Sequence, residues 1–281
     1  LFGGRGKTLT ARGIVLSAGA LGTNRLLADC KHRGSLPQLS NRLGELVRTN
    51  SESVLAVTLP DDAEQIWNSV AISSSIHTDA DTHIEVVTYG QKGDFMNFLF
   101  TLLTGKGSRW TRIFMLLGNI VRRPVTFLKS LWPVGWSRRT LFLLVMQSLD
   151  NAIAFRPKKR LFGDGVRLTT EQDPDKPNPT YIDAGNKAAE WIANWTGGYG
   201  QSMLLEAVAN IPTTAHILGG AVVGADPEHG VIDSEHRVFG YQNMLICDGS
   251  AVPANPGVNP SLTICAMSER AMSKIPAKER H

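Results

Sequence analysis

The feature that most constrains the fold of this chain is a strand, a turn of small residues and a helix near its beginning. Residues 13–17 (GIVLS) have the composition of a strand, residues 18–22 (AGALG) form a tight turn, and a helix follows the capping types Thr23 and Asn24. Small residues let the backbone approach a cofactor, so Ala18 and Gly19 are candidate cofactor-binding residues. This layout predicts a nucleotide-binding α/β fold, although GxGxxG is absent from the sequence.

A second informative feature lies near the other end of the chain. His216 stands just before Gly219 and Gly220, and the pair Asn259-Pro260 follows later. Asn favours the N-cap and Pro the first helical position, so we expect a helix that begins at Pro260. Its positive dipole end would face whatever lies before it. A general base and such a helix end together would form a redox or acyl-transfer site.

Each of these residues also has a simpler interpretation. His216 could be a buried histidine satisfied by backbone bonds, but the flanking glycines and the later Asn-Pro pair favour a base. Asn259 is explained by helix capping alone, and Asp248-Gly249 by a strand end and a turn. The other histidines show no metal-ligand spacing, so no metal site is predicted. GxSxG and P-loop motifs are absent from the sequence, which argues against those hydrolase and nucleotide-binding classes.

The middle of the chain has the alternation of an antiparallel sheet. Strands are predicted at residues 53–59, 70–76 and 83–89, and residues 139–148 are either a central strand or a buried helix. Further strands are expected at 151–155 and 165–168, and helices at 180–195 and 201–209.

The net charge of +4 conceals an asymmetry. Residues 95–149 hold eight Lys and Arg and no acid, which is +8 locally and leaves −4 for the remainder. A basic, apolar block is typical of a membrane-surface element, and its apolar runs are shorter than the ~18 residues of a spanning helix. A solvated helical excursion with a basic outer face is equally consistent with this composition. Nucleic acid is not favoured as a partner, because long aliphatic runs separate the basic residues.

The cysteine content indicates the redox state of the cellular compartment. The three cysteines are odd in number and form no CxxC pair, which argues against a disulfide framework and a zinc site. A reducing compartment is preferred, so we expect a cytoplasmic or peripheral membrane location. The chain begins with Leu1 and not with methionine, and we expect it to be a fragment of a longer protein.

Three blocks together give a resemblance to a known family. The chain resembles the C-terminal half of glucose-methanol-choline (GMC) flavin oxidoreductases at residues 13–27, residues 216–220 (HILGG) and residues 243–270. The last of these blocks contains the Asp-Gly-Ser and Gly-Val-Asn-Pro motifs. Within that family, the chain is most similar to the cholesterol oxidase branch.

The resemblance implies a role for each matched position. His216 would take the hydroxyl proton of a sterol-like alcohol, and Asn259 would contact the substrate oxygen or the flavin. The flavin of FAD would receive the hydride, and O2 would reoxidise the flavin. The residues that would bind FAD lie at the two helix starts and in the Asp-Gly-Ser turn: Ala18, Gly19, Asp248, Gly249, Asn259, Pro260 and Ser261. A dehydrogenase with another acceptor, an enzyme for a non-steroid alcohol and a non-catalytic lipid-binding fragment remain open.

Three departures from the family pattern qualify this implication. Ile217 stands where the family usually has Pro. Relatives that also isomerise the Δ5 double bond use a carboxylate that should fall near residues 136–150, where Asp150 is the only acid, so no isomerase activity is expected. The half with GxGxxG is missing, so the ADP part of FAD has no site in the chain and a second half of the enzyme is an expected partner.

These observations predict the overall organisation. The fold class is α/β, with a partial FAD-binding Rossmann-like domain formed by residues 1–48 and 214–281. Residues 49–213 would form a substrate domain with an antiparallel sheet and helices, and residues 95–140 would be an insertion over the pocket mouth.

Overall fold

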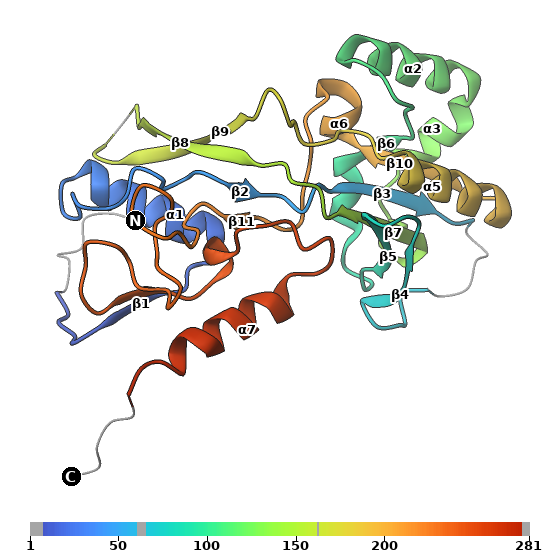
Figure 1. Ribbon diagram of the computed structural model, residues 1–281. Helices are drawn as coiled ribbons and strands as arrows, with labels where there is room; N and C mark the ends of the chain where they lie inside the picture. The colour runs from blue at the N-terminus through green and yellow to red at the C-terminus, as the bar shows by residue number, and fades with distance from the viewer. Residues whose placement is uncertain (1–7, 61–65, 162, 277–281) are drawn as a thin grey trace.

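The computed structural model describes residues 8–60, 66–161 and 163–276, and it shows a mixed α/β fold (Figure 1). The described residues form a two-stranded, a four-stranded and a six-stranded sheet with helices against them, which confirms the predicted class. The predicted division at residues 48/49 and 213/214 stays a prediction, and its outermost residues, 1–7 and 277–281, lie outside the described ranges.

The predicted strand and helix near the beginning of the chain are present. Strand β1 (Ile14–Leu16) leads into helix α1 (Gly19–His32) and pairs in parallel with β12 (Met244–Ile246), which is far away in the sequence. An apolar core joins these elements and includes Leu27 and Ile246, neither of which is exposed to solvent. Both ends of the chain therefore build one unit.

A four-stranded sheet covers this unit. Its order is β11 (Leu218–Gly219), β2 (Val47–Arg48), β8 (Ile153–Lys159) and β9 (Val166–Gln172), with antiparallel neighbours throughout. The β8–β9 hairpin thus pairs with β2, and β2 pairs on its other side with β11 from much later in the sequence. Figure 1 shows α1 beneath this hairpin.

The six-stranded sheet is the largest element and confirms the three predicted strands at residues 53–59, 70–76 and 83–89. Its order is β4 (Ile72–His77), β5 (Thr82–Thr88), β7 (Thr140–Gln147), β3 (Ser53–Thr58), β10 (Tyr199–Met203) and β6 (Phe100–Leu102). Every adjacent pair is antiparallel. The apolar run at 139–148 is therefore the strand alternative, β7, and it lies between β5 and β3.

The two faces of this sheet pack against different partners. Helix α5 (Asp183–Thr196) covers one face, where Leu55, Ile84 and Val145 are buried against Ala189. The opposite face packs Ala56 and other side chains against an aromatic cluster of Phe100, Trp136 and Phe142. Because side chains alternate along a strand, His83 and Glu85 point away from α5 when Ile84 points toward it.

The basic block contains several short elements. Helix η1 (Asp94–Leu99) precedes β6, and helices α2 (Arg109–Arg122), α3 (Pro124–Ser130) and α4 (Trp136–Arg139) precede β7. Residues 95–140 are therefore not wholly an insertion, because β6 and the buried Trp136 belong to the six-stranded sheet and its core. None of the described helices is both long and apolar enough to span a membrane.

Three predicted helix starts are wrong. Helix α1 begins at Gly19, six residues before the expected start, because Thr23 and Asn24 bond to distant partners and do not cap it. Helix α5 begins at Asp183, and the expected cap Thr180 instead bonds to Asn210. The stretch predicted as a helix at 201–209 begins as strand β10, and only α6 (Leu204–Ala209) is helical.

The last helix also begins one residue later than predicted. Helix α7 (Ser261–Met272) has Pro260 at its N-cap and no side-chain capping bond. Asn259 does not cap it, because Pro260 takes the N-cap position, and the side-chain amide of Asn259 donates to Glu85 of β5. Helix α7 therefore begins with its first-turn N–H groups free of a capping side chain.

Candidate active site

His216 is held by a carboxylate that sequence reasoning did not identify. Its Nδ1 forms a short contact with Oε1 of Glu52, whose side chain is 0% exposed, while the His216 side chain is 19% exposed. A carboxylate on Nδ1 fixes the proton on that nitrogen and leaves the Nε2 lone pair free to act as a base. The pair has the arrangement of a histidine base and its orienting acid.

Glu52 also fixes the backbone before His216. Its Oε2 accepts hydrogen bonds from the Ala215 amide at 2.5 Å and the Thr214 hydroxyl at 2.8 Å. The His216 amide bonds to Thr214 Oγ1 at 2.9 Å. Both oxygens of this buried carboxylate are therefore satisfied, as burial of a charge requires, and the ring of His216 has little freedom to turn.

Glycine is required at the two positions after Leu218, because neighbouring atoms lie too close there for a Cβ atom. Gly219 has φ +71°, and a Cβ there would lie 2.1 Å from the backbone oxygen of Leu46. A Cβ on Gly220, at φ +85°, would lie 2.5 Å from the side-chain amide of Asn24. Asn24 in turn donates to the Gly219 carbonyl at 3.0 Å. The glycines thus let β11 pack against α1, and they set the position of His216 relative to that helix.

Asn259 lies beside a second carboxylate. Its Nδ2 donates to Glu85 Oε2 at 2.7 Å, and the Glu85 side chain is 8% exposed. Glu85 comes from the six-stranded sheet, whereas Asn259 precedes α7. The amide and the carboxylate therefore meet where the two parts of the fold meet.

Asn50 ties the two halves of this site together. It lies two residues before Glu52, and its side chain bonds to the Gly257 amide at 2.8 Å and the Val258 carbonyl at 3.0 Å. Its backbone has φ +59°, a left-handed conformation that Asn adopts more readily than most residues. The segment that carries Asn259 is thereby fixed to the segment that carries the partner of His216.

Asp248 has a structural role in these contacts. Its Oδ2 accepts a hydrogen bond from Thr23 of α1 at 2.5 Å, and its Oδ1 accepts from the Ser250 amide at 2.8 Å. Gly249, in η2 (Gly249–Ala251), is buried, and a Cβ there would lie 3.2 Å from the Leu218 side chain. The predicted cofactor residues Asp248 and Gly249 thus join α1 to β11 directly behind His216.

The remaining predicted site residues lie at two helix starts. Ala18 is the N-cap of α1 and Gly19 its first residue, while Pro260 and Ser261 stand in the same positions on α7. In neither helix does the side chain of the N-cap residue make a capping hydrogen bond. Each therefore presents N–H groups that suit a partially negative group. All predicted site residues are described, and their role toward a ligand stays a prediction.

Asp150, the only acid in the region 136–150, has contacts of its own. Asp150 is 74% exposed at its side chain and bonds to Arg48 and Lys176. The acid beside Asn259 is Glu85, which the sequence analysis did not single out. A sign was present in the sequence, because His83 and Glu85 alternate with apolar residues in a strand, which predicts that polar groups gather on one face.

A third acid, Glu206 of α6, supports the loop before His216. It is 0% exposed, and its oxygens accept from Thr213 in a short contact at 2.5 Å and from Ser53 Oγ at 3.0 Å. Burial raises the pKa of Glu206 to about 7, against the opposing effect of these hydrogen bonds and of Arg112. Ser53 adjoins Glu52, so both carboxylates hold the same segment.

The raised pKa predicts how stability depends on pH. The folded protein keeps a proton on Glu206 up to about pH 7, whereas the unfolded chain releases it near 4.5. Protonated Glu206 therefore contributes fully to the free energy of unfolding below the unfolded pKa. This contribution, roughly 3 kcal/mol in total, is lost as pH rises through the folded pKa.

Glu206→Gln should remove most of this decline. Urea unfolding at pH 5 and pH 8 measures it, with the exposed Glu269→Gln as the matched control. An unchanged decline in Glu206→Gln would contradict the assignment.

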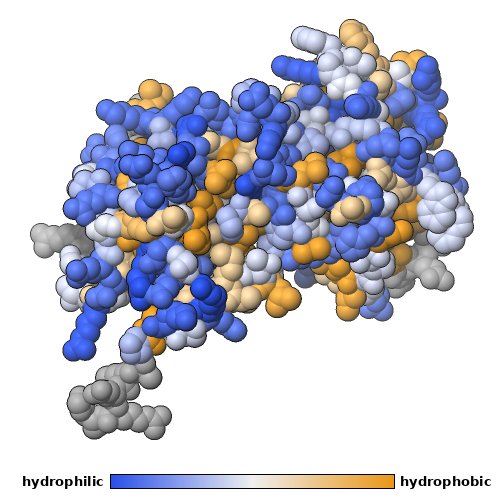
Figure 2. Space-filling model, in the orientation of Figure 1, coloured by the Kyte–Doolittle hydropathy of each residue, from blue (hydrophilic) through white to orange (hydrophobic). Residues whose placement is uncertain are grey.

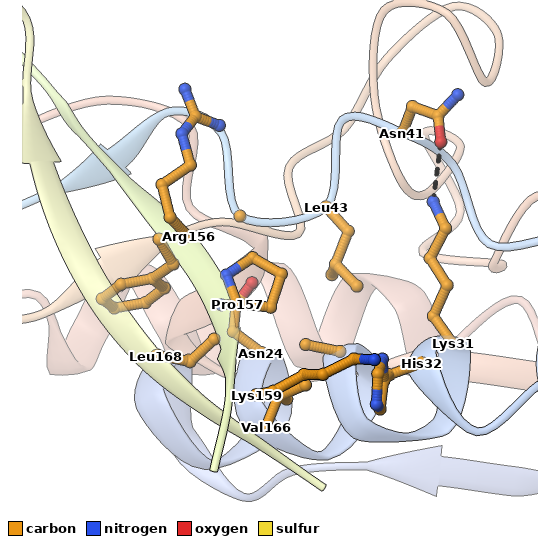
Figure 3. A pocket seen from close by; sticks show the side chains of 13 residues that line it. Asn24, Lys31, His32, Asn41, Leu43, Arg156, Pro157, Lys159, Val166 and Leu168 are labelled. Atoms are coloured by element: carbon orange, nitrogen blue, oxygen red, sulfur yellow. Dashed lines mark hydrogen bonds between the residues drawn. The ribbon is translucent and has the colours of Figure 1, made fainter. Parts of the chain in front are cut away.

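A cavity of about 460 Å³ lies away from these residues, between α1 and the β8–β9 hairpin (Figure 3). Its rim carries the basic side chains Lys31, His32 and Lys159, and Lys31 bonds to Asn41 at 2.8 Å. None of the predicted site residues lines it. Within the described part of the chain, no cluster of three or more His, Cys, Asp or Glu could hold a metal ion.

Comparisons with known proteins agree with this geometry. A sequence model described as GMC oxidoreductase matches residues 166–268, which include His216 and Asn259. A cholesterol oxidase of Mycobacterium tuberculosis is 47% identical over 97% of this chain and 48% of its own length. A cholesterol oxidase of Acinetobacter baumannii is 41% identical over 99% of this chain and 50% of its own length.

A solved structure is similar in fold. The pyridoxine 4-oxidase from "Mesorbium loti" has a TM-score of 0.51 at 13% identity, over 93% of this chain and 51% of that one. The chain spans about half the length of the curated relatives that it matches. Residues 166–268 thus match the GMC oxidoreductase family, and nearly the whole chain is similar to about half of each of the two cholesterol oxidases.

Proposed function

We propose that this chain supplies the catalytic end of an enzyme that oxidises a sterol-like secondary alcohol to a ketone with FAD. The observation that carries the proposal is the His216–Glu52 pair, a base oriented by a buried acid. The similarity to cholesterol oxidases supports the sterol class of substrate. We call the protein that joins this chain to the other half of those relatives' length the assembled enzyme.

The residues would divide the work of oxidation between them. Glu52 holds the proton on Nδ1 of His216, so Nε2 can take the proton of the substrate hydroxyl. Loss of that proton weakens the carbinol C–H bond, whose hydride then leaves. Asn259 has its amide directed to Glu85, and its remaining donor capacity would orient the substrate oxygen. FAD, when bound, would accept the hydride, and O2 is the proposed final acceptor.

The chain's own residues fit the flavin end of FAD. Helices α1 and α7 each begin without a side-chain cap, after Ala18 and Pro260, so their first N–H groups are available to a polar flavin edge. Gly19 has φ +73° and open space at the Cβ position, which allows close approach. Ser261 stands at the start of α7. Asp248 and Gly249 would act from behind, by holding α1 in place.

Exposed apolar surface supports a role for the second half. Parallel strands are normally buried on both faces, yet Ile14 and Val15 of β1 are 53% and 46% exposed. Leu21 of α1 and Leu262 of α7 are 49% and 81% exposed. Leu21 and Leu262 lie in the first turns of α1 and α7, whereas Ile14 and Val15 lie beside the end of α7. The proposed second half would cover these side chains and would supply the ADP site.

Glu85 favours a second activity at the same site. A β,γ-unsaturated ketone made from a Δ5 sterol has an acidic C–H between its carbonyl and its double bond. The Glu85 carboxylate would take that proton, and the carboxylic acid so formed would return a proton to the far alkene carbon as the double bond moves into conjugation. Glu85 is 8% exposed at its side chain, and Asn259 fixes one of its oxygens. Such a shielded, oriented carboxylate suits proton transfer at carbon.

A substrate panel tests the proposed function. The assembled enzyme should produce ketone and peroxide from cholesterol with higher kcat/KM than from benzyl alcohol, choline or glucose. Preference for one of the latter would support a GMC enzyme for a non-steroid alcohol. Sterol binding without turnover, in a protein shown to hold FAD, would support a lipid-binding protein and contradict the proposal.

We also propose that α2 and α3 contact a lipid surface. Ten apolar side chains from α2 to just beyond α3 are at least 37% exposed, with Trp110 at 66%, Phe114 at 69% and Val121 at 79%. Six of the eight basic residues of the block are also exposed, whereas Arg112 is buried. Figure 2 shows hydrophobic and hydrophilic residues interspersed at the upper right, where Figure 1 places α2. This mixture fits an anionic membrane surface.

Arg112 explains why this surface has a fixed place on the fold. Its guanidinium donates to the Thr180 carbonyl at 2.6 Å and to Thr104 Oγ1 at 3.1 Å. The buried arginine therefore ties α2 to the segment before α5 and to the segment after β6, and the exposed apolar residues of α2 are held on the outside.

Vesicle flotation distinguishes this contact from a solvated basic face. The double variant Trp110→Ser, Phe114→Ser should lose binding to phosphatidylserine-containing vesicles. Replacement of any one exposed arginine of α2 by Ser should weaken that binding about fivefold. The stacked, exposed pair Trp191 and Trp195 of α5 provides the matched control, because its double Ser variant should still bind. Failure of the unaltered chain to float with the vesicles would contradict the proposal.

A further inference from the structure

The starting observation is an unsatisfied nitrogen beside the site. Nδ1 of His83 is buried and makes no hydrogen bond in the described part of the protein. Its side chain is 7% exposed. A buried ring nitrogen without a partner is costly, and such a group in a folded protein calls for an explanation.

The nearest charged group is the carboxylate assigned to proton transfer. Nδ1 of His83 lies 3.7 Å from Oε1 of Glu85, and the two residues stand on the same face of β5. The other oxygen of Glu85 accepts from Asn259 at 2.7 Å. The carboxylate is therefore held at one oxygen, while its free oxygen points to an imidazole that a small rotation would bring into hydrogen-bond range.

His83 also leads toward the protein surface. Its ring stacks on the ring of His77, with centroids 4.4 Å apart and an interplanar angle of 17°. His77 stands opposite His83 in the register of β4 and β5, and β4 is exposed along its whole length. An imidazole with one nitrogen toward Glu85 and a stacking partner at the surface is placed between the site and solvent.

The surroundings contain few other charged groups. The partner of His83 on β7 is Met146, which is uncharged and buried. In the turn between β4 and β5, Asp79 accepts from the Asp81 amide and Asp81 accepts from Ser148, so both are already bonded. The groups that can exchange a proton with His83 are therefore Glu85 on one side and His77 or solvent on the other.

We propose that His83 is a positioning residue that exchanges protons between Glu85 and solvent. When Glu85 has taken the proton from the substrate carbon, Nδ1 of His83 accepts it, and Nε2–H of the same ring releases a proton to water. The reverse exchange returns a solvent proton to Glu85, which delivers it to the far alkene carbon. Only N–H and O–H bonds are made or broken in the exchange between Glu85, His83 and water, and no oxidant is consumed. This inference rests on the proposed isomerisation.

Deuterium labelling tests the exchange directly. The assembled enzyme with FAD bound is given the unconjugated 5-en-3-one of cholesterol in D2O, and the deuterium at the carbon that receives the proton is measured in the conjugated product. The unaltered enzyme should incorporate solvent deuterium there. His83→Phe keeps a flat ring on His77 but has no nitrogen, and it should lower the incorporation severalfold, because the proton taken by Glu85 is then returned before it exchanges.

Controls keep the outcomes separate. His83→Gln, which can bond to Glu85 but cannot pass a proton through a ring, should behave like His83→Phe and covers the case in which the phenylalanine variant does not fold. His77→Phe keeps the stack and should retain most of the incorporation. Equal deuterium content in the His83 variants and the unaltered enzyme would overturn the relay while leaving isomerisation intact. Absence of any conjugated product would overturn both.

Discussion

His216→Ala is expected to lower kcat for sterol oxidation in the assembled enzyme by about 10²–10⁴-fold, the usual contribution of a positioned general base. The ring is the group that Glu52 orients through Nδ1. Removal of the ring leaves the hydroxyl proton without an acceptor. Stopped-flow measurement of flavin reduction under saturating cholesterol gives the rate of this step.

The same variant should keep its flavin. The proposed flavin contacts come from the starts of α1 and α7, whereas His216 lies before β11. The visible absorbance of bound flavin is therefore expected to be unchanged. His216→Gln serves as a variant of similar size in case alanine disturbs the loop. Turnover near that of the unaltered enzyme would rule out His216 as the base.

Glu85→Gln has the second largest expected effect and acts on a different step. It should lower the rate of formation of the conjugated ketone at least about 10²-fold, because an amide cannot take a proton from carbon at neutral pH. Gln can still accept the Asn259 hydrogen bond through its carbonyl oxygen, so the local geometry is preserved. The ultraviolet absorbance of the conjugated enone, followed after addition of the unconjugated ketone, measures the rate.

Oxidation should respond much less to this change. Glu85 contacts Asn259 and not His216, so Glu85→Gln should still consume sterol and release peroxide, with accumulation of the unconjugated ketone. Glu171→Gln, at an exposed strand position, is the matched control. If Glu85→Gln and the unaltered enzyme isomerised the ketone at the same rate, the role assigned to Glu85 would be wrong.

Much of the fold followed from local patterns. The alternation of residue types in β3 and β5 and the apolar strand before α1 predicted those elements, because successive side chains of a strand point to opposite faces. The errors occurred where distant contacts decide. Thr23 and Asn24 have the chemistry of helix caps, yet they lie inside α1 because their side chains bind Asp248 and the Gly219 carbonyl. Strand β10 likewise depends on its partners β3 and β6.

The same distinction applies to the site. His216 and Asn259 could be recognised from the motifs around them, whereas Glu52 and Glu85 have no motif of their own. Each is separated from its partner by more than 150 residues, and only the sheet pairing and the Asn50 contacts bring them together. Geometry also changed the meaning of Asn259, from a helix cap to the partner of a carboxylate.

Anaerobic mixing of cholesterol with the assembled enzyme tests the central claim most directly. If this chain supplies the base for flavin-dependent sterol oxidation, the absorbance band of oxidised flavin should disappear on mixing and one ketone should form per flavin reduced. Readmission of air should restore the band. A flavin that stays oxidised with saturating cholesterol, in an enzyme that binds the sterol, would contradict the account.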